Sequence, residues 1–177
     1  MRNQLHWTWG AALVWGVLCG PLLAEPVGKH ITMKIDMEDS TDYKNIAGST
    51  ARSKEQHRQL NVTLDNRDKE PAADVSVKWA IYSRKMDSHK LVTVKQGTTK
   101  ARIEALSTTS VKSDKVTIKG TPRHTVVTRK SVKGKVQNNS KTEPATGEEY
   151  YGYAVAVYAG TVLIDEVFSQ PSLKLTK

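Results

Sequence analysis

Apolar and polar residues alternate in several short stretches of the chain, and the clearest stretch runs from Val75 to Tyr82. Its apolar positions are Val75, Val77, Trp79 and Ile81. Side chains of a strand point alternately to the two faces of a sheet, so this pattern predicts a half-buried strand. Trp79 is the only tryptophan after residue 24. We therefore expect it to lie in the core.

Weaker alternations predict further strands on both sides of this one. They cover residues 31–37, 60–66, 91–95, 101–106, 116–118 and 124–127. Residues 38–54 are polar and are expected to form a loop anchored by Tyr43 and Ile46, and Gly97 is expected to turn the chain. No window has a sustained 3.6-residue apolar repeat, so the pattern favours an all-β architecture.

The segment after residue 150 predicts a hairpin. A turn at residues 159–160 places Val157 opposite Val162 and Val155 opposite Ile164, so that β-branched side chains share one face. Gly160 supplies the permissive backbone that such a turn needs. The expected structural core is Trp79, Tyr151, Tyr153, Val155, Val157, Val162 and Ile164.

The first 24 residues have the layout of a secretory signal peptide. An apolar run from Trp7 to Leu23 follows Arg2, and composition turns polar at Glu25. Cleavage is expected after Ala24, with retention as an N-terminal anchor as the alternative. The mature chain, residues 25–177, is then one periplasmic or secreted bacterial domain with no transmembrane span. It contains no cysteine, because Cys19 is the only one.

Two blocks of the chain resemble a known architecture. Residues 60–66, the turn 71–74 and the strand 75–82 are similar to the B to C region of bacterial immunoglobulin-like and fibronectin type III-like domains. Tyr151 and Tyr153 look like the tyrosine corner of such domains, although the antibody-type cysteine pair is absent. The whole chain resembles small secreted bacterial proteins made of one such domain. The resemblance implies an antiparallel β-sandwich of about seven to nine strands and implies no reaction.

Positive charge is concentrated in one segment. The net charge is +9, and residues 100–141 contain 11 Lys or Arg against 2 acids. We expect residues 107–141 to form a basic excursion rich in Ser, Thr and Lys. One interpretation is capture of a polyanion through Arg123, Arg129, Lys130, Lys133 and Lys135. The other, which we prefer at this point, is a solvated hairpin whose lysines protect an exposed edge.

Other charged and aromatic groups suggest chemistry only weakly. Asp36, Glu38, Asp39 and Asp42 offer oxygen ligands for calcium but lack the spacing of a calcium loop. The acid pairs 148–149 and 165–166 occupy adjacent strand positions, which point to opposite faces and do not converge on one bond. The histidines are scattered, and no G-x-S-x-G motif occurs. We therefore expect that the protein is not an enzyme and that it has no cofactor and no metal site.

The sequence therefore predicts a non-catalytic extracytoplasmic module for binding, adhesion or envelope assembly. Its partner would be an envelope protein or an anionic polymer. Dedicated nucleic-acid binding is not expected, because the basic segment has no aromatic residue for base stacking. The alternative function is a carbohydrate-binding or hydrolytic accessory domain, for which Tyr150 and Tyr158 are the candidate exposed rings.

The apolar run and the polar switch at Glu25 predict the N-terminus of the exported protein. N-terminal sequencing and intact mass of the mature protein should show a chain that begins at Glu25. A protein that keeps Met1 and stays in the membrane fraction would contradict this expectation.

Overall fold

The computed structural model describes residues 30–70, 72–132 and 135–175, which form ten strands and no helix. Every pairing among them is antiparallel, so the all-β expectation is confirmed. The N-terminal segment with Arg2, Ala24 and Glu25 lies outside the described residues. The strands are β1 (Ile31–Asn45), β2 (Arg52–Asn66), β3 (Ala72–Lys85), β4 (Leu91–Ile103), β5 (Thr108–Lys112), β6 (Val116–Thr121), β7 (His124–Val132), β8 (Lys135–Glu143), β9 (Thr146–Ala159) and β10 (Val162–Phe168).

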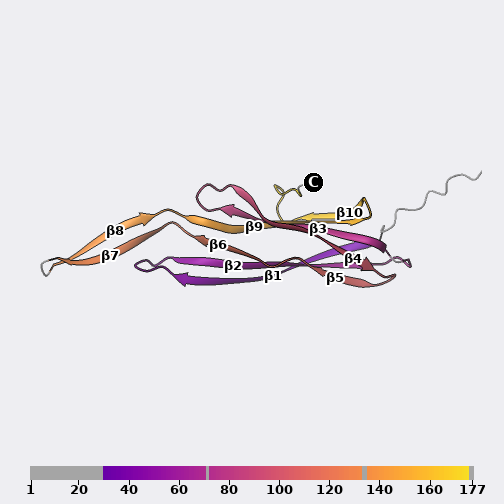
Figure 1. Ribbon diagram of the computed structural model, residues 1–177, viewed down its shortest axis with the longest axis horizontal. Helices are drawn as coiled ribbons and strands as arrows, with labels where there is room; N and C mark the ends of the chain where they lie inside the picture. Colours follow the sequence, from indigo (N-terminus) through magenta and orange to yellow (C-terminus); the bar gives the residue numbers. More distant parts are fainter. Residues whose placement is uncertain (1–29, 71, 133–134, 176–177) are drawn as a thin grey trace, which may run out of the picture.

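Eight of these strands form two layers that face each other (Figure 1). One layer contains β1 and β2, with β5 and β6 on the far edge of β2. The other layer has the order β10–β9–β3–β4. The two layers meet at β9, which pairs with β6 at its start, with β3 over residues 148–159 and with β10 over residues 154–159. The remaining strands, β7 and β8, pair with each other beyond the layers.

Strands β5 and β6 act as one interrupted strand, since β5 pairs with residues 61–65 of β2 and β6 pairs with residues 54–58. Ser113 fills the break between them. Its backbone N–H donates to the Leu60 carbonyl at 2.9 Å, and its buried hydroxyl accepts from the Leu60 N–H at 2.9 Å. The sequence pattern missed β5 because Val111 is the only apolar residue in it.

Apolar side chains of both layers fill the space between them. Leu60, Val62 and Leu64 of β2 are fully or almost fully buried, as are the inward-facing residues of β3 and β9. Trp79 is 4% exposed, and Val155 and Val157 are not exposed at all. In β2 the buried positions alternate with less buried ones, as the sequence pattern predicts for residues 60–66.

Gly97 does not form a turn, and the neighbouring Trp79 ring explains why a glycine stands at this position. β4 runs without interruption from Leu91 to Ile103, and Gly97 pairs with Trp79 in its middle. A Cβ atom on Gly97 would lie 2.6 Å from a carbon of the indole ring. The glycine therefore makes room for the tryptophan, and the expected division into two short strands is wrong.

The expected loop at residues 38–54 is largely a hairpin. β1 and β2 remain paired as far as Asn45 and Arg52, and only residues 46–51 turn. Tyr43 is 62% exposed and anchors nothing in the core. Polar side chains can continue a ladder because its hydrogen bonds come from the backbone, so hydrophobicity alone misjudged the length of this hairpin.

The hairpin of β9 and β10 exists, but its expected register is wrong. Val162 pairs with Ala159, so the turn is Gly160–Thr161, with Gly160 at φ +58°. Val162 is 53% exposed and does not belong to the core. A shift between Leu163 and Asp165 brings Ile164 partly into the core. The turn is one residue later than the sequence pattern indicated, which changes every pair.

A second irregularity corrects the placement of the tyrosines. In β9, Gly152 pairs with Tyr82 and Tyr150 pairs with Ser83, which leaves Tyr151 as an extra residue. Such a bulge reverses the alternation. Tyr150 and Tyr153 consequently pack against the main core, whereas Tyr151 lies on the opposite face. The expectation that Tyr151 faces the core and Tyr150 faces solvent is therefore wrong.

The outer face of β3 and β9 is also covered, by the C-terminal segment. Leu173 is 2% exposed and packs with Ala80, Tyr82 and Ala154 in a second cluster. The Tyr82 hydroxyl donates to the Lys174 carbonyl at 2.6 Å. From Trp79 to Ser83, β3 is thus buried on both faces, rather than on one as its alternation suggested, whereas Lys78 remains exposed.

The contact between Trp79 and Gly97 predicts coupled effects on stability. Trp79→Ala should lower the free energy of unfolding by about 3–5 kcal/mol, because it removes a large buried ring. Gly97→Ala should lower it by about 1–3 kcal/mol through overpacking, and this cost should nearly vanish in the double variant. Urea unfolding of the four proteins measures the cycle. An equal cost of Gly97→Ala with and without Trp79 would contradict the packing described.

Candidate functional site

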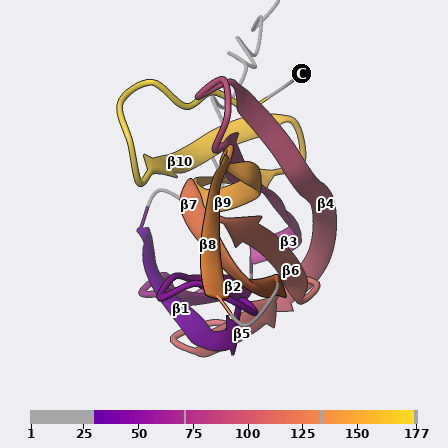
Figure 2. The same cartoon turned by 90° about the vertical axis from the view of Figure 1, so that its left-hand side faces the viewer.

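The β7–β8 hairpin, which we call the arm, projects from one end of the two layers (Figures 1 and 2). It contains an unbroken ladder from His124–Glu143 to Val132–Lys135. In the described part of the chain neither strand pairs with any other strand. All its described residues between Val127 and Thr142 are exposed. The arm therefore adds surface and little core.

Two prolines separate the arm from the layers. β6 pairs with β9 as far as Thr121 and Thr146, and after the break β7 pairs with β8 in the same register. Pro122 and Pro144 stand in the break, on opposite strands. Proline cannot donate a ladder hydrogen bond, which explains the gap in an otherwise continuous ribbon. The arm is thus an extension of β6 and β9.

The turn between β1 and β2 supports the base of the arm. The Gly48 carbonyl accepts a hydrogen bond from the Val127 N–H at 2.8 Å, and Gly48 has φ +70°. A Cβ atom on Gly48 would lie 2.9 Å from the Val127 carbonyl oxygen and 3.2 Å from a methyl carbon of Val126. Glycine is thus required here by both backbone conformation and close approach.

The two faces of the arm differ in character. Opposite residues of an antiparallel pair share a face, so the register assigns each side chain. One face carries Lys130, Lys135 and Lys141, together with Glu143 and the exposed Val132. The other carries Arg129 and the exposed valines Val127 and Val136. Three lysines against one acid make this face of the narrow ribbon positive.

Most of the arm's charge is not neutralised by neighbouring acids. Lys141 lies 2.8 Å from Glu143, and this hydrogen bond raises the pKa of Lys141 and lowers that of Glu143. Among the described residues no carboxylate pairs with Arg129, Lys130 or Lys135. Four cations of the layers lie beside acids: Lys112–Glu38 is 2.6 Å, Lys95–Asp114 is 2.9 Å, Lys119–Glu55 is 3.1 Å and Arg102–Glu104 is 3.1 Å.

The basic segment of the sequence is therefore not one excursion. Residues 108–121 belong to the layers as β5 and β6, and only the part from His124 onward forms the arm. Of the five expected polyanion contacts, Arg129, Lys130 and Lys135 lie on the arm, and Lys133 is outside the described residues. Arg123 lies at the base of the arm, next to Pro122.

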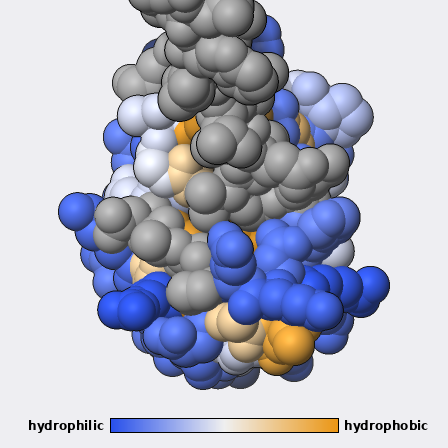
Figure 3. Space-filling model, turned by 90° about the vertical axis from the view of Figure 1, so that its right-hand side faces the viewer, coloured by the Kyte–Doolittle hydropathy of each residue, from blue (hydrophilic) through white to orange (hydrophobic). Residues whose placement is uncertain are grey.

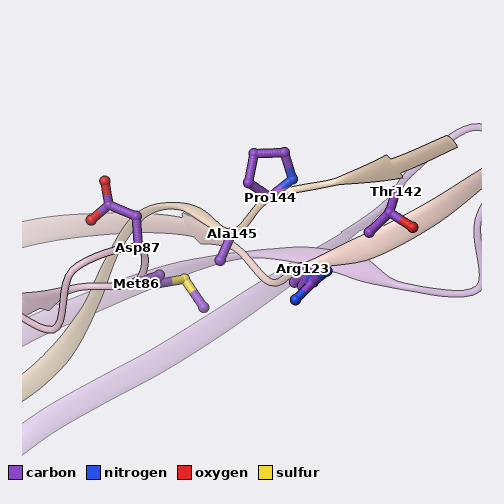
Figure 4. Close-up of a pocket in the computed structure, with 6 residues that line it drawn as sticks. All are labelled: Met86, Asp87, Arg123, Thr142, Pro144 and Ala145. Atoms are coloured by element: carbon purple, nitrogen blue, oxygen red, sulfur yellow. The ribbon is translucent and has the colours of Figure 1, made fainter.

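A cleft of about 430 Å³ opens where the arm leaves the layers (Figure 4). It is lined by Met86, Asp87, Arg123, Thr142, Pro144 and Ala145. The Asp87 carboxylate points away from Arg123 in Figure 4, so the two charges do not converge on one point. The opposite end of the molecule has a mainly hydrophilic described surface with scattered apolar patches (Figure 3).

A polar junction beside the arm was not expected from the sequence. Arg58 is 7% exposed, donates to the carbonyls of Ser40 and His57 at 3.1 and 2.9 Å, and lies over the Tyr150 ring. The Gln56 side chain accepts from the Tyr150 N–H at 3.0 Å. These contacts, together with Lys54–Glu149 at 3.0 Å, join the two layers where the apolar core ends. The periodicity of β2 is the one signal for it, since Gln56 and Arg58 occupy the same face as Leu60.

The acidic residues considered for calcium are spread along β1, and each lies near a basic side chain. Asp36 lies 3.0 Å from Lys34, Glu38 lies 2.6 Å from Lys112 and Asp42 lies 3.4 Å from His57. Asp39 lies 3.7 Å from the guanidinium of Arg58. Over residues 30–70, 72–132 and 135–175 no group of three His, Cys, Asp or Glu side chains could hold a metal ion. Nothing here assembles a cation site.

The paired carboxylates are likewise separated. Glu148 accepts from the buried Ser83 hydroxyl, whereas Glu149 bridges to Lys54. Asp165 pairs with Val157, and Glu166 pairs with Ala156 on the neighbouring position. Each pair therefore diverges, as expected for adjacent strand residues. The described residues also contain no helix that is long and apolar enough to cross a membrane.

Both tyrosine rings considered for sugar binding, and that of Tyr151, have a cation over one face. Arg58 lies 5.1 Å from the Tyr150 ring centre, Lys78 lies 4.8 Å from that of Tyr158, and Arg84 lies 4.3 Å from that of Tyr151. The Tyr151 hydroxyl shares a hydrogen bond with Ser172 at 2.8 Å. Because this partner lies downstream in the chain, Tyr151 does not make the tyrosine-corner contact that the resemblance implied.

Comparisons with known proteins add no family. No family model matches the chain, and no curated protein matches it. Among solved structures, a crystal structure of a protein from Archaeoglobus fulgidus is 10% identical, with a TM-score of 0.25, over 67% of this chain and 96% of that one. A likeness of this size supports no inference about fold or function.

Tyr150 predicts a pH dependence of stability. Burial, helped by the nearby Tyr153, raises its pKa from the ordinary 10.0 to about 12. The unfolded state then loses the phenolic proton at lower pH than the folded state does. This contribution to the free energy of unfolding is complete below pH 10 and declines between pH 10 and about 12.

Tyr150→Phe should remove one late-titrating phenol from the ultraviolet titration and reduce the loss of stability over that range. Tyr151→Phe is the matched control, because a hydrogen bond with Ser172 lowers the pKa of Tyr151. Loss of the late phenol in the Tyr151 variant instead would contradict the assignment of the bulge.

Proposed function

We propose that this protein is a non-catalytic binding module of the bacterial envelope, and that its arm captures an anionic partner. The observation that carries the proposal is the position of Arg129, Lys130 and Lys135. They stand on a ribbon that projects from the layers, without a carboxylate partner among the described residues. Exposed charges attract over about 8 Å at physiological ionic strength, so a projecting ribbon meets a partner before the body does.

The contrast between arm and body supports a role beyond solubility. Several lysines of the layers lie beside acids, as Lys112 and Lys119 do. Others, such as Lys69, Lys100 and Lys115, are exposed and have no acid partner among the described residues. A protein that needed charge only to stay in solution could carry it in this dispersed form. On the arm, Arg129, Lys130 and Lys135 lie close together on a projecting ribbon, and such locally concentrated charge favours electrostatic capture.

The architecture proposed for the module is immunoglobulin-like or fibronectin type III-like. Support comes from the strand order β10–β9–β3–β4 in one layer and β1–β2–β5/β6 in the other. If β3, β9 and β10 correspond to strands C, F and G, this order agrees with the Greek key of such sandwiches. Export of the module is proposed from the sequence of residues 1–24 alone.

Replacing three arm cations tests the proposed function. Arg129→Gln, Lys130→Gln and Lys135→Gln together should weaken binding to heparin and to polyglutamate by about tenfold or more at low salt, and flatten its salt dependence. The melting temperature should change little, because exposed charges contribute little to folding.

The matched control removes the same charge from the body, through Lys69→Gln, Lys100→Gln and Lys115→Gln. These three lysines are exposed and lie on loops or strands of the layers. Binding by the control should resemble that of the original protein. Equal losses in both triple variants would show a response to net charge alone, and absence of binding by the original protein would refute the proposal.

A further inference from the structure

The outer edge of β8 is an open strand edge with a strongly basic face beside it. From these two features we propose that β8 receives an extended acidic segment of a partner protein as a third strand of the arm. This inference rests on the proposed function, since it names the class of anionic partner that the arm captures. Strand addition of this kind obtains affinity from main-chain hydrogen bonds and specificity from alternate side chains.

The hydrogen bond of Val127 fixes which backbone groups point outward. Its N–H donates to Gly48 and not to β8. In an antiparallel pair the outward-pointing residues recur with a period of two, so Arg129 and Ser131 also point away from β8. Their opposite residues on β8 are Asn138 and Val136, whose backbone groups point outward on the other side.

The two edges of the arm are not equally accessible. The Gly48 turn occupies the base of the β7 edge. No backbone hydrogen bond among the described residues reaches the outer edge of β8, from Lys135 to Glu143. A strand of nine residues is therefore available along its full length. For this reason the proposal assigns the partner to β8.

Charge and hydrophobicity on the arm specify the sequence of the partner strand. An added strand places alternate side chains over the two faces of the ribbon. Acidic side chains would lie on the face of Lys130, Lys135 and Lys141. Small apolar side chains would lie on the face that carries Arg129 and the two valines, where Val136 is 69% exposed and Val127 is 44% exposed. The partner segment thus alternates acidic and apolar residues.

The same features favour a protein over other polyanions. A polysaccharide or a nucleic acid has no backbone N–H and C=O series that would satisfy a strand edge. The described arm residues also include no Phe, Tyr or Trp ring on which sugars or bases could stack. Val127 and Val136 would also stay uncovered. A second copy of the arm is disfavoured because it would place the same lysines against each other.

Protection of an edge by lysines is compatible with this role. Lysines on an edge discourage pairing with neutral or basic strands, since each pairing partner would have to approach a positive surface. The same lysines attract an acidic strand. An edge of this type is therefore selective, and the charge of the incoming strand decides whether it pairs.

A peptide experiment on the full mature chain tests the inference. The probe is a nine-residue peptide that alternates Glu with Val or Thr, labelled for fluorescence anisotropy. Its matched controls are the same peptide with alternate backbone nitrogens methylated, which keeps the charge but blocks pairing on one edge, and the same peptide with Lys in place of Glu.

We expect the acidic peptide to bind at least tenfold more tightly than either control, and amide exchange to slow in the arm at Asn138 and Ser140. Equal binding of the acidic and the methylated peptides would show charge capture without strand addition. That result would overturn this inference and leave the proposed function intact. Heparin binding without any peptide binding would have the same consequence.

Proline substitutions identify the edge on the protein itself. Asn138→Pro removes an outward donor from β8 without touching the ladder to β7, and Ser131→Pro does the same on β7. Asn138→Pro should lower the affinity for the acidic peptide at least tenfold and leave heparin binding unchanged, whereas Ser131→Pro should change neither. A loss with Ser131→Pro alone would overturn the assignment to β8.

Discussion

The structure depends on one strand, β9, which is shared between the two layers. Its first residues pair with β6, the following residues pair with β3, and residues 154–159 lie between β3 and β10. A strand can change layers only where its ladder and its side-chain alternation are interrupted, and the extra residue at Tyr151 lies near this crossing. The bulge turns Tyr150 toward Arg58 and the layer of β2, so the same local irregularity that moves the strand also seals the end of the core.

Two kinds of packing hold the layers together. In the middle, large apolar residues are buried, and the contact of Trp79 with Gly97 shows how closely they approach. Toward the arm, the core gives way to Gln56 and Arg58, whose polar atoms contact backbone groups and the Tyr150 ring. Buried polar groups are tolerated only when they are hydrogen-bonded. The junction meets that condition and can therefore form the boundary between a dry core and an exposed ribbon.

The arm follows from the same ladder that closes the layers. β6 and β9 pair in the register that β7 and β8 continue, and Pro122 and Pro144 remove donors at the boundary. A two-stranded ribbon alone in water is only marginally stable. Its attachment to β6 and β9, and the bond from Val127 to Gly48, provide the stability that its own side chains do not. The arm can consequently devote its side chains to lysines, asparagines and exposed valines, which is the composition of a surface for contact with a partner.

Local pattern determined the all-β class, the strands at 60–66 and 75–82, the place of Trp79 and the concentration of basic residues, because each of these depends on near neighbours in the chain. The tertiary structure decided what depends on distant neighbours. Gly97 resembles a turn until the Trp79 ring is placed beside it, and residues 38–54 resemble a loop until β2 supplies backbone partners. Tyr151 and Val162 follow a strict alternation in the sequence, whereas a bulge and a turn one residue later put them outside the core. The basic segment is divided between the layers and the arm for the same reason. The position of a strand is set by the strand with which it pairs, and this pairing exists only in the folded chain.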